Sequence, residues 1–420
     1  MTTSAIINNK KIILITVAFY LFYLLGFVLN EDSNGGAFQD YLGYKSIIKL
    51  FILDFKNTFL TYDELGERHS PVFIIILSYF YKLNLSDTLI RFISFNFSLI
   101  SIIFFLKCLT LKYKYINKNY LLLISFIFFL SPTFRSLSIW PDSRIYGFHF
   151  FIISVFFYLK YFCESKNIYY CYLNIIFLAI SSYFSINFCL FSIFFLYKFY
   201  LDLGISKKFF NCVLLNFFLA SPAFYYLFIL KIFFIELGTP GNYINEYNFS
   251  NTFNIANKIL IISSIILFYF LPVLIAKKKI FFDNNKIKIF EFIIIFLFFL
   301  LITKFFNYEP YFTGGGIFFH LSYFLFENNF LFLVISYYAL IIIYRLCKNN
   351  TNNLFLICLI FLSNPQLSIY HKYYDPLIIF LIFTLLKTEL NNNYFNLKNI
   401  CLIHIFYISF LFISVIKSTF

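Results

Sequence analysis

Three carboxylates follow closely behind the first apolar segment of this chain. Glu31 and Asp32 come directly after the run 12–29, and Asp40 lies further along the same polar stretch. A carboxylate held beside a hydroxyl can take its proton while the oxygen attacks an electrophilic carbon, which is general base catalysis. We rank Asp32 first as such a base, Asp40 second and Glu31 third. The plainer alternative is that they are solvated acids of an exposed loop.

Arginine is scarce in this sequence. Only five of the 33 basic residues are arginine, and four of these lie in segments that the span map below places on one side of a membrane: Arg68, Arg91, Arg135 and Arg144. A planar guanidinium binds phosphate through two parallel hydrogen bonds, which an ammonium group cannot do. We therefore expect a phosphate-bearing ligand on that side, bound by Arg91, Arg135 and Arg144. The alternative is that these side chains reach toward the interface or pair with nearby acids.

Further polar clusters lie in the same outer segments. The segment 131–144 holds the single tryptophan, and the segment 364–376 holds the pair His371-Lys372. We interpret His371 and Lys372 as auxiliaries of the phosphate site. The residues expected to bind substrate are Arg68, His69, Trp140 and Asp142. No cofactor is expected, because the oxygen and nitrogen ligands that Asp32, Asp40 and His69 could offer a divalent cation lack a tight spacing.

The composition is typical of a polytopic helical membrane protein. Hydrophobic residues make up 61% of the chain and charged residues 12%, and the mean hydropathy is +0.82. These values lie far from those of soluble domains. The net charge of +14 has no aromatic–basic motif beside it, so we expect no nucleic acid as partner. The eight cysteines lack the spacing of a disulfide framework or a zinc site.

The apolar runs predict thirteen spans in one transmembrane domain over 1–420, with no soluble C-terminal domain. Their ranges are 12–30, 88–108, 117–133, 145–162, 168–184, 186–201, 209–234, 257–276, 288–305, 328–346, 353–369, 374–388 and 399–416. The segment 72–83 is left out because its helix would reach only about 18 Å, against about 30 Å of hydrocarbon. Lysines then gather in alternate loops, most clearly at 277–279, which places that block and the N-terminus in the cytoplasm.

The first extracytoplasmic loop, about 31–87, is predicted to hold two juxtamembrane helices. In the first, helical spacing gathers apolar side chains on one face, namely Phe38, Tyr41, Leu42, Ile48, Phe51 and Ile52. Such an amphipathic helix would lie on the membrane surface. Gly35-Gly36 would let the chain turn sharply onto that surface. The segment 72–83 is the second helix.

This layout resembles the GT-C superfamily of polyprenyl-phosphate-sugar-dependent glycosyltransferases, such as protein O-mannosyltransferases and lipid A aminoarabinose transferases. The acid of the family's first loop matches Glu31 or Asp32, in inverted order, with Asp40 as the rival. The family's arginine at the start of the second span matches Arg91, and its proline element is matched by 69–71. The segment 131–144 is similar to the family's loop between the third and fourth spans. The segment 371–376 resembles a Tyr-Asp-Pro element near the end of some bacterial members of the family.

The resemblance implies an inverting transferase in membrane lipid, in the inner membrane of a bacterial cell. It would move a sugar from a polyprenyl-phosphate donor to a glycan, lipid or protein acceptor at the extracytoplasmic face. A carboxylate would activate the acceptor, and cations would stabilise the departing phosphate. One alternative is a polymerase or ligase of lipid-linked polysaccharide, whose main loop would come late in the chain. Another is a transporter of lipid-linked glycans, which predicts ionisable residues at mid-membrane rather than at helix ends.

Overall fold

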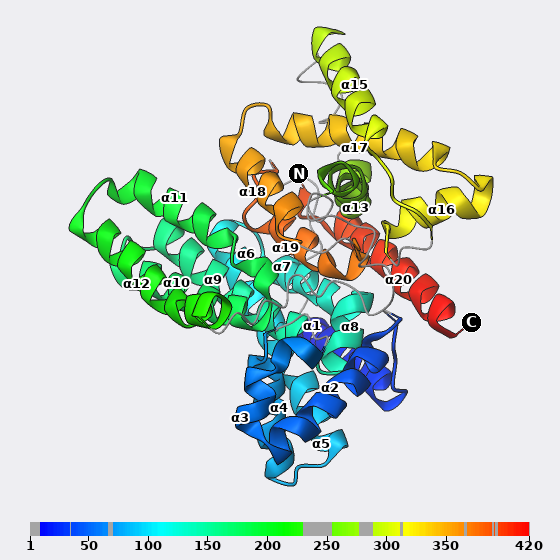
Figure 1. The fold of residues 1–420 in the computed structure, drawn as a ribbon. Helices are drawn as coiled ribbons and strands as arrows, with labels where there is room; N and C mark the ends of the chain where they lie inside the picture. Colours follow the sequence, from blue (N-terminus) through cyan, green and yellow to red (C-terminus); the bar gives the residue numbers. More distant parts are fainter. Residues whose placement is uncertain are drawn as a thin grey trace. The chain divides into compact units, whose positions relative to one another are not determined.

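The chain folds entirely into helices and turns wherever the structure describes it. This computed structural model describes residues 9–33, 35–65, 70–229, 254–276, 289–310, 314–364, 368–388, 390 and 394–419. The chain groups into two compact units (Figure 1): unit 1 comprises Met1–Pro240 with Phe395–Phe420, and unit 2 comprises Gly241–Tyr394. The expected single domain over 1–420 stays a prediction, and each unit is described by itself.

Eight helices within the described ranges are long and apolar enough to cross a bilayer. They are Lys10–Val28, Asp87–Lys112, Ser143–Cys163, Ile186–Leu203, Lys207–Phe228, Ile255–Ala276, Phe330–Cys347 and Leu397–Lys417. The pair Lys118–Leu130 and Pro132–Ile139, bent by 63°, would make a ninth if it counts as one span. The all-α prediction is confirmed for the described residues, and these helices are candidate spans, whereas thirteen spans stay a prediction.

Four of the predicted spans fall on shorter helices. Helices α10 (Ile168–Phe184) and α15 (Ile289–Lys304) have 17 and 16 residues, and α18 (Thr351–Leu362) and α19 (Leu377–Phe383) have 12 and 7. A helix as short as α19 reaches only about 10 Å. All seven of its residues are buried inside the protein. Hydropathy alone cannot distinguish such a core segment from one that faces lipid.

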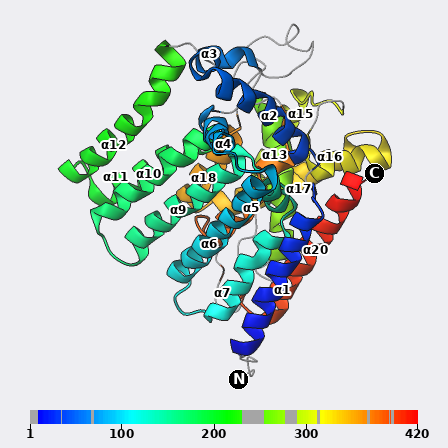
Figure 2. The same ribbon diagram turned by 90° about the horizontal axis from the view of Figure 1, so that it is seen from below.

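Unit 1 is built on two long helices, one from each end of the chain, that pack side by side. Helices α1 (Asn9–Val28) and α20 (Leu397–Thr419) run side by side (Figure 2), and the rings of Phe19 and His404 lie 5.5 Å apart. Helix α8 (Pro132–Ile139) packs against both and is buried along its whole length. Ser131 caps α8 by accepting a hydrogen bond from the Phe134 N–H, and Pro132 occupies the first helical position, where a missing N–H costs nothing.

Other helices of unit 1 form a layer beside this core. Helix α9 (Ser143–Cys163) packs against α10 and against α6 (Leu99–Lys112), which continues α5 (Asp87–Phe97) beyond Ser98. Helix α12 (Lys207–Phe224) packs on α10, and α11 (Phe191–Leu203) lies against α12. Asp142, one of the predicted site residues, is the N-terminal cap of α9, so its position is set by this layer of helices.

The two helices predicted within the first loop are both present as helices. They are α2 (Ala37–Leu53) and α4 (Val72–Lys82), with the short α3 (Phe55–Leu60) after α2. Of the predicted apolar face of α2, Tyr41, Ile48 and Phe51 are buried inside the protein, whereas Phe38 and Leu42 are 38% and 39% exposed. The buried stripe instead runs through Ala37, Tyr41, Tyr44, Ile47, Ile48 and Phe51. These positions follow the three- and four-residue spacing of one helix face, which packs on α4.

Unit 2 surrounds one central helix, α13 (Ile255–Ala276), most of whose residues are buried. Helix α17 (Phe330–Cys347) lies along it, and the Ser336 hydroxyl donates a hydrogen bond of 3.2 Å to the Leu260 carbonyl. Helix α16 (Gly316–Phe326) also packs on α13. Two non-helical segments meet in this unit, since the Gly315 N–H donates to the Ile369 carbonyl at 2.9 Å.

Candidate functional site

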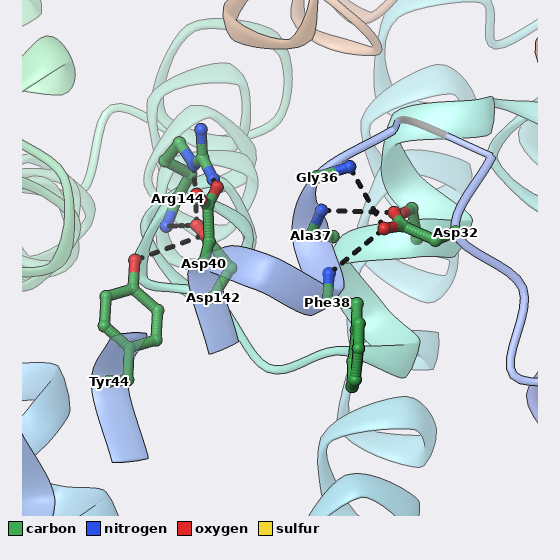
Figure 3. Close-up of polar contacts among 9 residues, drawn as sticks. Asp32, Gly36, Ala37, Phe38, Asp40, Tyr44, Asp142 and Arg144 are labelled. Atoms are coloured by element: carbon green, nitrogen blue, oxygen red, sulfur yellow. Dashed lines mark hydrogen bonds and ion pairs between the residues drawn. The ribbon is translucent and has the colours of Figure 1, made fainter. Parts of the chain in front are cut away.

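Asp32 serves as a cap for helix α2. Its carboxylate accepts hydrogen bonds from the backbone N–H groups of Gly36, Ala37 and Phe38 at 3.0, 3.1 and 3.2 Å (Figure 3). The Ser136 hydroxyl donates a fourth, at 2.7 Å. A carboxylate has about four lone-pair positions, so these bonds account for all of them. Asp32 therefore anchors the start of α2 and joins it to α8.

Asp40 lies one turn into α2 and points toward α9. Its Oδ2 accepts a hydrogen bond of 2.6 Å from Nη2 of Arg144, and its side chain is 38% exposed (Figure 3). Arg144 is itself held by Asp142, whose Oδ1 accepts from the Arg144 Nε at 2.7 Å and whose Oδ2 accepts from Nη2 at 2.5 Å. Tyr44 donates to the same Oδ2 at 3.2 Å. One guanidinium thus lies between a buried carboxylate and a partly exposed one.

Glu31 and Arg135 form a separate, buried ion pair. The Arg135 Nε lies 2.8 Å from Glu31 Oε1 and 3.0 Å from Oε2, and Nη2 contacts Oε2 as well. Arg135 also donates to the carbonyls of Phe129 and Phe22, and its side chain is 2% exposed. Arg135 is therefore engaged by protein groups on every nitrogen. This geometry matches the alternative left open from the sequence, in which an arginine pairs with a nearby acid.

Arg91 stacks on Trp140. Its guanidinium carbon lies 3.6 Å from the centre of the indole ring, Nε donates to the Ile139 carbonyl at 3.1 Å, and Nη2 donates to Asn30 Oδ1 at 2.7 Å. The Trp140 Nε1–H donates to the Glu31 carbonyl at 3.2 Å. Among the described residues, none accepts a hydrogen bond from Nη1 of Arg91. That nitrogen can donate to a ligand without breaking a bond inside the protein.

A polar network at Asp87 holds α2 against α4 and α5. Asp87 accepts hydrogen bonds from Lys45 Nζ at 2.7 Å, from the Tyr41 hydroxyl at 2.8 Å and from the Tyr81 hydroxyl. Burial, followed by the hydrogen bond to Asp87, raises the pKa of Tyr81 to about 12. Burial likewise raises the pKa of Tyr41 well above its ordinary value. Both phenols stay protonated and keep donating at neutral pH, which fixes the helix that carries Asp40.

Unit 2 contains the other predicted cluster. His371 opens a short helical turn, His371–Tyr373, and its Nε2 lies 2.6 Å from the Tyr269 hydroxyl of α13. Lys372 lies over the Tyr370 ring at 5.0 Å. The hydrogen bond from Gly315 to the Ile369 carbonyl brings the glycine-rich segment 314–316 beside the segment that holds His371. Whether His371 and Lys372 also meet the arginines of unit 1 stays a prediction.

His371 contacts the middle of a long helix. From its spacing, this residue is predicted to lie in an outer loop between two spans. Its hydrogen-bond partner Tyr269 is fourteen residues into the 22-residue helix α13, about 21 Å from the Ile255 end. The expectation that ionisable residues lie at helix ends rather than at mid-membrane stays a prediction.

Two predicted site residues, Arg68 and His69, lie outside the described residues. Within the part of the chain that the structure describes, no three His, Cys, Asp or Glu side chains form a group that could hold a metal ion.

Sequence reasoning missed Tyr44 and Gly26. Tyr44 follows Asp40 by one helical turn, a spacing that places both on neighbouring surface. Gly26 is the single glycine of the first apolar run, and a Cβ there would lie 2.4 Å from both Arg135 Nη2 and Glu31 Oε2.

The arrangement in unit 1 can support proton transfer beside an anion site. The Asp40 side chain is 38% exposed, Arg144 places a guanidinium beside it, and Arg91 carries another on α5. The backbone that carries Asp40 and the arginines is instead held by three other side chains, namely Asp32, Glu31 and Arg135. Comparisons with protein-family models, with curated proteins and with solved structures find no match to this chain.

Proposed function

We propose that this protein is a membrane glycosyltransferase that moves a sugar from a polyprenyl-phosphate donor to an acceptor hydroxyl, with Asp40 as the base. The observation that carries the proposal is the contact between Asp40 and Arg144. It puts a partly exposed carboxylate and a guanidinium 2.6 Å apart, on a juxtamembrane helix and at the start of the apolar helix α9. Such a transfer needs a proton acceptor and a cation for the leaving phosphate side by side.

The proposed reaction balances within this site. The acceptor oxygen attacks the anomeric carbon, its proton passes to Asp40, and the bond from that carbon to the phosphate oxygen breaks. The phosphate leaves with the electron pair of that bond. Because the acceptor attacks the face opposite the phosphate, the configuration at the anomeric carbon inverts. Protonation cancels the negative charge that Asp40 presents to Arg144 while charge grows on the phosphate. The guanidinium can then exchange a carboxylate partner for a phosphate partner, and Arg91 Nη1 can add a second donor.

The structure supports Asp40 over Asp32 for this role. Asp32 already accepts four hydrogen bonds, three of which hold the first turn of α2. To take a proton it would have to give up a bond that orders the helix. Asp40 faces Arg144 and is open to solvent over more than a third of its side chain. We likewise leave Arg135 out of the phosphate site, because Glu31 and two carbonyls engage it.

The proposal places this site on the extracytoplasmic face, in the inner membrane of a bacterial cell. The N-terminus and the block 277–279 would lie inside, and the loop that carries α2 and α4 outside. Thirteen passes require the bent pair Lys118–Leu130 and Pro132–Ile139 to cross as one span, and the four shorter helices α10, α15, α18 and α19 to cross as well, in addition to the eight long helices. Labelling of single cysteines from outside tests this: position 60 should react and position 278 should not, and the reverse pattern would contradict the orientation.

The activity can be tested with the purified chain in lipid vesicles. The donors would be a panel of polyprenyl-phosphate hexoses and pentoses, the acceptors native membranes, and the readout release of polyprenyl phosphate together with sugar transfer. Asp40→Asn should lower turnover roughly 10²–10⁴-fold while donor binding persists. The matched control is Asp54→Asn in the same loop, an exposed acid whose Oδ1 caps α3. Wild-type turnover in Asp40→Asn, with an active wild-type enzyme, would reject the carboxylate mechanism.

One observation favours a second candidate, a transporter of lipid-linked glycans. It is the contact of His371 with the middle of α13, because ionisable residues at membrane depth line the pathways of transporters. Flipping of a fluorescent polyprenyl-phosphate sugar across vesicles that contain the protein tests this reading. Flipping without sugar transfer would favour it, and transfer without flipping would exclude it.

A further inference from the structure

Two lysines from neighbouring helices of unit 1 converge on one aromatic ring. Lys107 lies in the second-last turn of α6 and Lys160 in the last turn of α9, and these two helices pack against each other. Their Nζ atoms lie 5.7 and 5.8 Å from the centre of the Phe156 ring. The ends of the helices are also tied together, because the Lys114 Nζ donates a hydrogen bond to the Cys163 carbonyl. Both ammonium groups therefore lie at the same end of the helix pair, separated by no more than the sum of their distances to the ring.

Each of these lysines also lies over a second ring. The Lys107 Nζ is 4.6 Å from the centre of Phe104, and the Lys160 Nζ is 4.8 Å from the centre of Tyr170 at the start of α10. Phe104 and Phe156 meet edge to face with their centres 5.2 Å apart, which joins α6 to α9. A ring attracts an ammonium group without using up its three N–H donors. The rings thus position the two cations and leave their donors available to a ligand.

The charge around these helix ends is positive. The segment 107–118 has four lysines and no acid, and the segment 160–167 has two lysines and one acid. That acid, Glu164, lies 3.9 Å from Lys160 and is 54% exposed, and such an exposed contact is weak. Within the described residues, the Lys107 ammonium meets rings rather than a carboxylate. An anion that approaches this end of the helix pair meets two cations and one loosely held acid.

The surface next to the two lysines is apolar and open. Ile103 lies one turn before Lys107 on α6 and is 52% exposed, and Phe104 and Phe156 are half-buried. Helices α6 and α9 each belong to a candidate span. The lysines at their ends would lie at the level of the lipid head groups, with this apolar surface extending toward the middle of the bilayer. Positive charge above apolar surface is complementary to an anionic lipid.

We propose that the seam between α6 and α9 binds an anionic phospholipid of the leaflet that faces these helix ends. The lipid phosphate lies between the ammonium groups of Lys107 and Lys160, and an acyl chain covers Ile103 and Phe156. The orientation predicted from the sequence places these ends in the cytoplasm, where anionic lipids attract basic side chains close to the membrane. The site lies at the opposite end of α9 from Arg144, and the proposal does not depend on the transferase site at Asp40.

Binding can be measured by native mass spectrometry of the full chain released from a non-ionic detergent. Phosphatidylglycerol and phosphatidylcholine with the same acyl chains are titrated against the wild type and against two double variants, Lys107→Gln/Lys160→Gln and the control Lys207→Gln/Lys208→Gln. The control removes the same charge from two exposed lysines at the start of α12, on the same predicted side. The wild type should bind phosphatidylglycerol more tightly than phosphatidylcholine. The dissociation constant for phosphatidylglycerol should rise about 10- to 30-fold in the first variant and less than about twofold in the control.

Three results of this titration would overturn the proposal. Equal weakening in the two double variants would show that net charge alone attracts the lipid. Equal affinity of the wild type for the two lipids would show that the seam does not select an anion. Glycerol phosphate carries the head group without acyl chains, and if it bound as tightly as phosphatidylglycerol, the seam would be a site for a free anion rather than for a lipid.

Photolabelling of the wild-type protein tests the position of the lipid without any substitution. Phosphatidylglycerol with a diazirine near the glycerol end of one acyl chain, irradiated in vesicles, should label the peptides that contain Ile103 and Phe156 more strongly than the peptide that contains Phe210 and Leu214. These two control residues are 59% and 50% exposed and lie at the basic end of α12, so they match the depth and the apolar character of the seam. Equal labelling of the three peptides would refute the site. None of these measurements depends on sugar transfer.

Discussion

The buried ion pair between Glu31 and Arg135 offers the sharpest prediction for stability. Glu31→Gln keeps the shape of the side chain and removes its charge. Arg135, 2% exposed, would retain the carbonyls of Phe129 and Phe22 at 2.9 and 3.3 Å but lose the carboxylate that faces its Nε and Nη2. Breaking a buried pair from one side costs about 3–5 kcal/mol, because the remaining charge stays uncompensated. The retained amide oxygen of glutamine places the expected loss near about 3 kcal/mol.

Fluorescence of Trp140, the single tryptophan of the chain, can report the unfolding of these variants. The Trp140 indole N–H donates to the Glu31 carbonyl at 3.2 Å, so its fluorescence reports on this part of unit 1. Unfolding titrations in mixed micelles with a denaturing detergent would give the free energy of unfolding for each variant. The control is Glu164→Gln, which removes an exposed pair with Lys160 at 3.9 Å and should change stability by less than about 0.5 kcal/mol.

A double variant distinguishes an unpaired charge from a lost hydrogen bond. Glu31→Gln with Arg135→Met removes both charges, and it should be more stable than Glu31→Gln alone. Two results would refute the reasoning. One is a Glu31→Gln loss no larger than that of Glu164→Gln, and the other is a double variant less stable than the single one.

Three further predictions concern the elements around the site. Gly26→Ala should lower the free energy of unfolding by about 1–3 kcal/mol in the same titration, because its Cβ would lie 2.4 Å from atoms of the Glu31–Arg135 ion pair. The control is Gly43→Ala, whose Cβ would meet nothing within 4 Å, and it should be neutral or stabilising by up to about 1 kcal/mol. Asp32→Ala should speed hydrogen exchange in the first turn of α2 and cost about 0.5–2 kcal/mol, and unchanged exchange there would contradict the capping role. Arg91→Lys should shift Trp140 emission to the red, since the guanidinium stacked at 3.6 Å no longer covers the ring, and an unchanged spectrum would argue against the stack.

Local sequence patterns predicted the first loop well. Helical spacing and the short length of 72–83 were enough to place α2 and α4, because both signals are local. Which of these apolar residues pack inside the protein did not follow from spacing alone. Phe38 and Leu42 lie about 100° around the helix from the stripe that packs on α4, and tertiary packing decides which face meets α4.

The candidate site was predicted in its residues more than in their roles. The rarity of arginine and its concentration on one side of the span map drew attention to Arg91, Arg135 and Arg144, and the structure gives each a different environment. The role of each arginine depends on the acid with which it pairs. Asp40 lies 104 residues before its partner Arg144, so no local sequence pattern indicates that this pair forms. The same holds for α19, a seven-residue helix inside an apolar run that reads as a span.

The turnover of Asp40→Asn beside that of Asp32→Asn tests the central claim most directly. With saturating polyprenyl-phosphate sugar and rates normalised to folded protein, the Asp40 variant should lose roughly 10²–10⁴-fold. The Asp32 variant should lose less than about tenfold, because its amide oxygen can still accept from the N–H groups of Gly36 and Phe38, and only the bonds to the other oxygen are lost. Wild-type turnover in Asp40→Asn, or a larger loss in Asp32→Asn than in Asp40→Asn, would contradict the account.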